Sequence, residues 1–137
     1  MNNNKKFSLV VVDDDYAITT FFNVYIKKFP IENLDIRTFN DPIECLNYVL
    51  GCDVRDDCPD IVVIDRQMPS IPGDALNVML KEYNPNLYTI LYTGEDLPTE
   101  ATRKSYGFDA AFTKCASPSK IINFIRSKVA DLNAEIC

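Results

Sequence analysis

The stretch FSLVVVDDDYA, residues 7–17, joins an apolar run to three adjacent carboxylates. Residues 7–12 are typical of a buried β-strand. Apolar residues then recur at helical spacing from Ile18 to Phe29, which predicts a helix that ends near Pro30. Three neighbouring negative charges repel one another, and a polar turn alone would not need them. The stretch therefore predicts a strand and a helix joined by a turn whose charge needs a chemical explanation.

The alternation of strand and helix continues along the chain. Further strands are predicted at residues 34–39, 61–64, 87–93 and 111–114, and further helices at about 42–50, 75–83, 97–107 and 118–132. Strands that alternate with helices form parallel sheets with right-handed crossovers, and five units are too few for an eight-stranded barrel. The predicted fold is α/β, a (βα)5 flavodoxin-like doubly wound parallel five-stranded sheet with strand order 2-1-3-4-5 and helices on both faces. We expect residues 1–137 to form a single domain with its core at about 7–132.

The overall composition limits the possible partners and compartments. The net charge is −6, and no cluster of Lys and Arg exceeds a pair, so we expect no direct binding to nucleic acid. No apolar run approaches the roughly 20 residues that span a bilayer, and the apolar run after the N-terminus is too short for a signal peptide. We therefore expect a cytoplasmic protein that does not enter a membrane.

The chain has five cysteines and no histidine. No cysteines have the C-x-x-C spacing, so a structural zinc site is not favoured, and we expect reduced thiols that serve as small apolar side chains. The absence of histidine excludes Ser-His and Cys-His catalysis and any phospho-histidine carried by this chain.

The predicted topology selects the residues that form a site. Ligands of doubly wound sheets bind beyond the carboxyl ends of the strands, where the strand order reverses. The residues that follow the strands there are Asp13, Asp14, Asp65, Thr93 and Lys114. Carboxylate oxygens suit Mg²⁺, with Mn²⁺ as the alternative, and a cation offsets the repulsion between the carboxylates. The sequence thus predicts a metal site at this rim.

Asp15 has a different expected role from its two neighbours. It stands where the first helix begins, and a negatively charged cap is favourable at that end of a helix.

Four segments resemble the motifs of the response regulator receiver domain of two-component signalling. They are LVVVDDDYAI, IVVIDRQMPSIPGDAL, ILYTGED and FTKCASPSKI, and they occur in the order and spacing of that family. The resemblance implies that Asp65 accepts a phosphoryl group. It also implies that Asp14 and Asp65 ligate Mg²⁺ directly, that Asp13 acts largely through water, and that the backbone carbonyl of Gln67 supplies another oxygen.

The same resemblance implies roles for two more residues and for partners. Lys114 would pair with Asp65 and then with a phosphoryl oxygen, while Thr93 would hydrogen-bond another phosphoryl oxygen and move inward. The phosphoryl donor would be a sensor histidine kinase or a phosphotransfer protein. A downstream protein would bind the face formed by the helix at 97–107, the strand at 111–114 and the last helix.

The chain departs from the family pattern at two positions. Ala111 stands where the family usually has an aromatic switch residue, and neighbouring Phe112 is expected to face the opposite side of its strand. Cys115 follows Lys114 where the family usually has a cis proline. A cis bond before a non-proline residue costs about 2.5–4 kcal/mol, so we expect a trans Lys114–Cys115 bond.

The loops around the predicted phosphoryl site also differ in size and charge. Gly94 is small and leaves the site open, whereas Gln67 and Glu95 flank the opening. We expect these two flanking residues to set the lifetime of the phosphorylated state.

Two alternative functions remain open from the sequence. The segment VVVDDDYA also fits the Asp-x-Asp pattern of haloacid dehalogenase-like phosphatases, with Asp13 as nucleophile and Asp15 as acid and base. The second alternative is a degenerate receiver that is never phosphorylated and serves only as a binding module. Under the leading hypothesis the chain is not an enzyme, beyond any loss of its own phosphoryl group.

Overall fold

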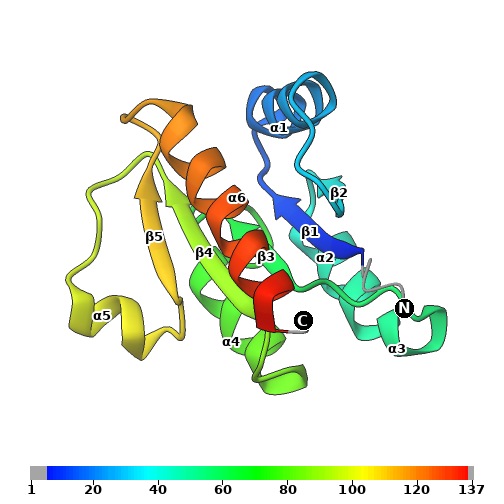
Figure 1. Cartoon of the computed structure of the whole chain (residues 1–137). Helices are drawn as coiled ribbons and strands as arrows, with labels where there is room; N and C mark the ends of the chain where they lie inside the picture. The colour runs from blue at the N-terminus through cyan, green and yellow to red at the C-terminus, as the bar shows by residue number, and fades with distance from the viewer. Residues whose placement is uncertain (1–5, 136–137) are drawn as a thin grey trace.

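The computed structural model describes residues 6–135, and within them five strands form one parallel sheet (Figure 1). The strands are β1 (Phe7–Val12), β2 (Leu34–Phe39), β3 (Ile61–Ile64), β4 (Tyr88–Thr93) and β5 (Ala110–Thr113). Their order in the sheet is β2-β1-β3-β4-β5, and every neighbouring pair is parallel. This confirms the predicted topology, and the bounds of the first three strands are those predicted from the sequence.

The helices follow the strands as predicted, with one addition. They are α1 (Tyr16–Lys28), α2 (Pro42–Leu50), α3 (Cys52–Arg55), α4 (Gly73–Tyr83), α5 (Glu100–Ser105) and α6 (Pro118–Glu135). The short helix α3 lies between the predicted helix at 42–50 and the predicted strand at 61–64, where the sequence predicts no helix. Helix α5 is shorter than predicted because Thr99 caps its start through the amide of Thr102. Among residues 6–135, no helix has the length and apolar character needed to cross a membrane.

Helices cover both faces of the sheet because alternate residues of the central strands point to opposite sides. On one side, Leu9 and Val11 of β1 pack with buried residues of α1 and α6. On the other side, Val10 and Val12 pack with buried residues of α2 and α4. All four residues of β3 are buried, as the continuous apolar run at 61–64 predicts.

The predicted cap of the first helix is confirmed, and a second aspartate caps α2. The side chain of Asp15 accepts a hydrogen bond from the amide of Ala17 and caps α1. Asp41 caps α2 in the same way through the amide of Ile43. Asp15 is thus turned to the helix, while Asp13 and Asp14 remain beside the ends of the strands.

The cysteines correct the expectation of reduced thiols. Cys52 and Cys58 form a disulfide, whereas Cys45 is a buried free thiol and Cys115 an exposed one. Asp56 adopts the left-handed backbone conformation, which turns the chain so that Cys58 returns to Cys52. The six-residue separation of this pair carries no pairing motif, so the sequence alone does not reveal it. Cys137 lies outside the described residues.

Gly73 begins α4 and lies against the backbone that follows β3. Its amide donates a hydrogen bond of 2.9 Å to the carbonyl of Arg66. A Cβ atom at this position would lie 2.0 Å from the carbonyl oxygen of Asp65 and 2.9 Å from Cα of Arg66. The absence of a side chain at Gly73 is therefore what lets α4 pack beside the end of β3.

We expect Gly73→Ala to lower the free energy of unfolding by about 1–3 kcal/mol, because the backbone at Asp65 must move to admit the methyl group. The measurement is chemical denaturation followed by circular dichroism. Gly94→Ala is the matched control, since its Cβ meets nothing within 4 Å. A Gly73→Ala protein as stable as the wild type would contradict this account of the packing.

Candidate functional site

The register of the sheet places Asp13 beside Asp65. Val12 at the end of β1 pairs with Ile64 at the end of β3, so the next residues of the two strands are neighbours. Backbone hydrogen bonds continue past the strands. The amide of Asp65 donates to the carbonyl of Val12 at 3.1 Å, and the amide of Asp13 donates to the carbonyl of Phe39 at 3.0 Å. The position of both carboxylates is therefore fixed by the backbone of the sheet.

Three carboxylates and one ammonium group meet at this rim. Carboxylate oxygens of Asp13, Asp14 and Asp65 lie within 4.8 Å of one another. Lys114 Nζ is 2.7 Å from Asp13 Oδ2 and 3.1 Å from Asp65 Oδ1. Asp13 and Asp65 are buried, whereas Asp14 is exposed. The structure thus brings together four of the residues that the sequence predicts for the site.

Burial and repulsion raise the proton affinity of the two buried carboxylates. Burial, followed by the charge of Asp13, raises the pKa of Asp65 from 3.8 to about 6. Burial also raises the pKa of Asp13, although the hydrogen bond from Lys114 opposes this. For Lys114, burial would lower the pKa, but the two carboxylates outweigh it and raise the value. One lysine therefore compensates only part of the buried negative charge.

The donor set fits a hard divalent cation. Carboxylate oxygens are the ligands that Mg²⁺ prefers, and Mg²⁺ keeps several of its own waters. The exposed carboxylate of Asp14 leaves the cluster open on one side to such a hydrated ion. A cation here would also offset the charge that raises the pKa of Asp65. Asp13, Asp14 and Asp65 are thus chemically suited to hold Mg²⁺.

The remaining predicted residues lie at the end of β4 and in the loops that follow β3 and β4. Thr93 ends β4 and is buried, and its hydroxyl accepts a hydrogen bond of 3.1 Å from the amide of Glu95. Gln67 Nε2 donates to Glu95 Oε2 at 3.0 Å, which joins the loop after β3 to the loop after β4. Gln67 and Glu95 are predicted to flank the opening, but the hydrogen bond between them is not evident from the sequence.

The two departures from the receiver pattern behave as expected. All peptide bonds of residues 6–135 are trans, which includes Lys114–Cys115. Ala111 and Phe112 are partly buried and pack against the cores on opposite faces of the sheet, and Phe112 lies against Phe124 with 5.0 Å between ring centres. Phe112 therefore packs on the α1 and α6 side and does not substitute for an aromatic residue at 111.

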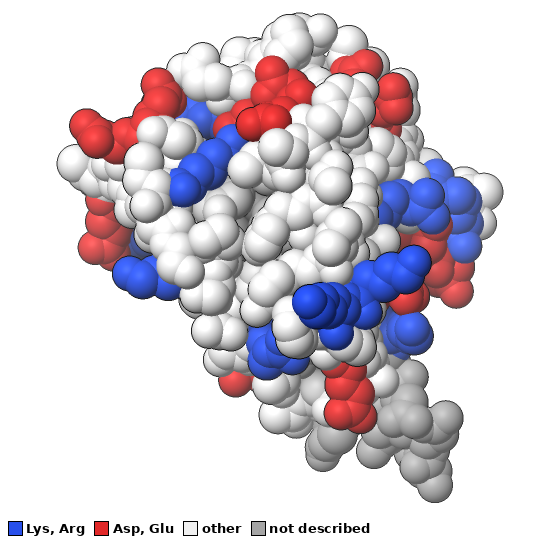
Figure 2. All heavy atoms as spheres, turned by 90° about the horizontal axis from the view of Figure 1, so that it is seen from above, with Lys and Arg blue, Asp and Glu red and all other residues white. Residues whose placement is uncertain are grey.

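The charged side chains near the site are of both signs. Figure 2 shows the face beyond the carboxyl ends of the strands, where lysine and arginine side chains form separate groups with acidic side chains nearby. This distribution agrees with the net charge of −6 and does not resemble the continuous basic surface that phosphate backbones attract.

The model of the response regulator receiver domain family matches residues 9–126. The chain belongs to this family. Most of the sheet and the whole carboxylate cluster fall inside the matched range. No curated protein sequence matches the chain significantly.

Solved receiver structures share the fold of this receiver domain. A CheY-like receiver from Methanospirillum hungatei JF-1 is 18% identical with a TM-score of 0.79, over 96% of this chain and 99% of that chain. The receiver domain of response regulator 1452 from Francisella is 25% identical with a TM-score of 0.70, over 90% and 99% of the two chains. The BeF3-activated receiver domain of DrrB, a Thermotoga maritima protein, is 23% identical with a TM-score of 0.73, over 91% and 98%.

Sequence reasoning missed part of how the lysine is held in this receiver domain. The predicted partner of Lys114 is Asp65, at 3.1 Å in the structure, but Asp13 lies closer to the ammonium group, at 2.7 Å. Lys114 Nζ also lies 5.9 Å from the ring centre of Tyr92, whose side chain is buried. The amide of Lys114 donates a hydrogen bond of 2.8 Å to the carbonyl of Thr93. The pairing of β5 with β4 therefore positions the lysine.

The raised pKa of Asp65 predicts how stability depends on pH. In the folded state Asp65 has a pKa of about 6, whereas an ordinary aspartate, as in the unfolded chain, has a pKa of 3.8. Folding therefore takes up a proton in this interval, and Asp65 makes the fold less stable as the pH rises through it. In buffer free of divalent cations, we expect Asp65→Asn to be more stable than the wild type at pH 7, by on the order of 2 kcal/mol.

Thermal unfolding of both proteins from pH 3 to pH 8 measures this difference, which should shrink as Asp65 becomes protonated. Asp35→Asn is the control, because Asp35 is exposed and contacts only Lys6 among the hydrogen-bonding side chains described. A difference between Asp65→Asn and wild type that stays constant with pH would contradict the assignment.

Proposed function

We propose that this receiver domain accepts a phosphoryl group on Asp65 in a Mg²⁺-dependent reaction. The observation that carries the proposal is the meeting of Asp13, Asp14, Asp65 and Lys114 at the end of the sheet. At pH 7 an aspartate with a pKa of about 6 is mostly ionised, so Asp65 is available as a nucleophile. The proposed domain comprises residues 1–137, with its core at about 7–132.

The reaction needs positioning and charge neutralisation more than covalent machinery. A carboxylate oxygen of Asp65 attacks the phosphorus of a phospho-histidine on the donor. The P–O bond of an aspartyl phosphate forms as the P–N bond breaks, and the imidazole leaves and takes a proton from water. Lys114, which lies 3.1 Å from Asp65, then pairs with an oxygen of the transferred group.

Each remaining site residue has a proposed part in holding charge. Asp14, Asp65 and the backbone carbonyl of Gln67 would ligate Mg²⁺ directly, and Asp13 would act largely through water. An ion held by these residues would supply positive charge that offsets the charge on the phosphoryl oxygens. The hydroxyl of Thr93 would leave the amide of Glu95 and bind a phosphoryl oxygen, which moves the loop after β4.

The proposed phosphoryl donor is a sensor histidine kinase or a phosphotransfer protein in the cytoplasm. The proposed output surface for a downstream protein comprises α5, β5 and α6. Helix α5 has no buried residue, so its side chains are accessible to a partner. Ala111 replaces the usual aromatic of the family, and the signal would therefore pass through the loop after β4 rather than through a turning ring.

The phosphatase alternative is not favoured by the position of Asp15. An acid and base must reach the group attached to Asp13, but the carboxylate of Asp15 accepts a hydrogen bond of 2.9 Å from Ala17 in the first turn of α1. The degenerate receiver is not favoured either, because the acidic cluster and the paired lysine are all present.

Incubation with acetyl phosphate and Mg²⁺ should add one phosphoryl group to the chain, as measured by intact mass. The label should be absent for Asp65→Asn and when the cation is removed with a chelator. Asp15→Asn is the matched control, since its side chain caps a helix outside the proposed chemistry, and it should be labelled like the wild type. Label that survives Asp65→Asn, or that is lost in Asp15→Asn, would contradict the proposed acceptor and favour the phosphatase alternative.

The Gln67–Glu95 hydrogen bond is expected to slow the loss of the phosphoryl group. It joins the two loops over the site, so Glu95→Ala should admit water and shorten the half-life of the labelled protein several-fold. Loss of label over time by intact mass gives the rate, and Asp96→Ala serves as an exposed neighbouring control. An unchanged half-life in Glu95→Ala would show that the bridge does not protect the aspartyl phosphate.

A further inference from the structure

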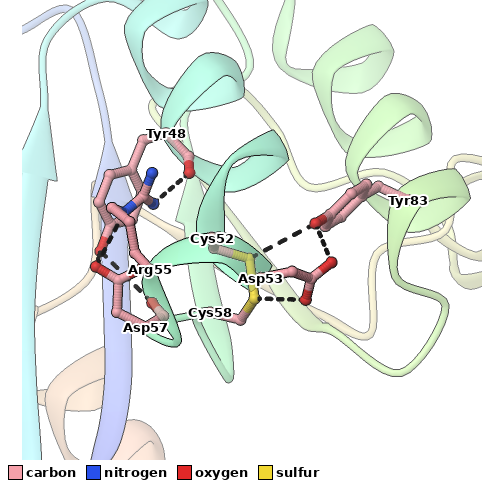
Figure 3. Close-up of a disulfide and its surroundings, with 7 residues drawn as sticks. All are labelled: Tyr48, Cys52, Asp53, Arg55, Asp57, Cys58 and Tyr83. Atoms are coloured by element: carbon pink, nitrogen blue, oxygen red, sulfur yellow. Dashed lines mark hydrogen bonds and ion pairs between the residues drawn. A yellow bond between two sulfur atoms is a disulfide. The ribbon is translucent and has the colours of Figure 1, made fainter.

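A second group of reactive side chains lies at the opposite end of the sheet from Asp65. Figure 1 shows α3 near the amino ends of the strands, and Figure 3 shows the Cys52–Cys58 disulfide in this segment. Asp53 Oδ1 lies 3.3 Å from the sulfur of Cys58. The hydroxyl of Tyr83 lies 4.0 Å from the sulfur of Cys52 and donates a hydrogen bond to Asp53 Oδ2. Two sulfurs and a carboxylate thus face one another.

Contacts other than the disulfide hold this segment in place. Arg55 pairs with Asp57 at 2.9 Å and stacks on Tyr48, with its guanidinium 4.0 Å from the ring centre. The hydroxyl of Tyr48 donates to Asp57 at 3.0 Å, and the amide of Asp57 donates to the carbonyl of Cys52 at 3.2 Å. Arg55 and Asp57 lie between the two cysteines in the chain, whereas Tyr48 precedes both. Because none of these contacts involves a sulfur atom, we expect them to persist on reduction and to keep the two thiols close together.

We propose that, in the reduced protein, the thiolates of Cys52 and Cys58 and the carboxylate of Asp53 bind one Zn²⁺ ion. The two sulfur atoms and a carboxylate oxygen of Asp53 lie within 4.8 Å of one another. The sulfurs are bonded to each other here, so reduction must first let them separate to the distance between two ligands of a tetrahedral ion. Soft thiolates select Zn²⁺ over Mg²⁺, so this site differs in chemistry from the carboxylate cluster. Asp53 is exposed, which leaves the fourth position to water.

Tyr83 is the positioning residue of the proposed site. Its hydroxyl donates to one oxygen of Asp53 and leaves the other oxygen directed to the sulfur of Cys58. A hydrogen bond that orients a ligating carboxylate in this way typically strengthens metal binding. The sequence gives no such signal, because the cysteine spacing is not that of a zinc motif and Tyr83 is distant along the chain.

Oxidation by a low-molecular-weight disulfide, such as glutathione disulfide, would release the ion. One thiolate attacks the disulfide, forms a mixed disulfide and expels one glutathione thiolate. The second cysteine thiolate then attacks the mixed disulfide and expels the other. The two cysteines lose two electrons, the oxidant gains two, and the zinc leaves as Zn²⁺ without a change of charge. The product is the disulfide described above.

Zinc binding by the full chain in the presence of a phosphine reductant tests the proposal. Millimolar Mg²⁺ is included to compete at the carboxylate cluster, and a chromogenic zinc chelator and native mass spectrometry report affinity and stoichiometry. We expect one Zn²⁺ per chain, at least about tenfold weaker binding in Cys58→Ser and Asp53→Asn, and no change in Cys115→Ser. After treatment with glutathione disulfide, the chain should release the ion and weigh two hydrogens less than the reduced apoprotein.

Replacement of Zn²⁺ by Co²⁺ gives a readout that does not depend on stability. Reduced wild type should show thiolate-to-cobalt charge-transfer absorption together with tetrahedral visible bands, and circular dichroism checks that each variant is folded. The proposal is overturned if the reduced wild type binds Zn²⁺ no more tightly than Cys58→Ser or Asp53→Asn, if the oxidised chain binds it equally well, or if the cobalt complex lacks thiolate absorption.

Discussion

The structure depends on two buried carboxylates that share one lysine. Asp13 and Asp65 are neighbours because β1 and β3 pair up to their last residues, and Lys114 lies 2.7 Å and 3.1 Å from them. Two buried negative charges against one positive charge leave a deficit, which is why burial and repulsion raise the pKa of Asp65 to about 6. A divalent cation would offset this deficit, and in the proposed reaction the incoming phosphoryl group would meet two positive centres beside Asp65.

The surrounding fold supplies a rigid frame and two adjustable loops. The carboxylates are tied to the sheet by backbone hydrogen bonds, and α4 packs on the carbonyl of Asp65 through a glycine. The side chains of Thr93 and Gln67 instead contact the loop after β4 through hydrogen bonds with Glu95. The backbone of the sheet thus fixes Asp65, while side-chain hydrogen bonds hold the loop beside it. This division suits the proposed switch, in which a loop responds to a change at a fixed residue.

The sequence predicts most of the frame because its signals are local. Apolar runs predict β1 and β3 with their observed bounds, and the alternation of apolar and polar residues predicts β2. Asp15 is predicted as the cap of the first helix from its position alone, which the structure confirms. Helix α5 is predicted too long because it buries no residue, so no apolar face marks its ends. The Cys52–Cys58 pair is missed because it depends on the left-handed turn at Asp56, a backbone feature that spacing does not reveal.

The contacts of Lys114 and Asp53 are missed for a different reason. Each joins residues that are far apart in the chain, so only the folded structure reveals them. Helix α4 connects the two regions. Its first residue, Gly73, packs on Asp65, and its last, Tyr83, bonds Asp53. Eleven residues at 1.5 Å each span about 16 Å, so a single helix separates the carboxylate cluster from the cysteine segment. The ends of α4 contact both regions because the helix runs from the carboxyl ends of the strands toward their amino ends.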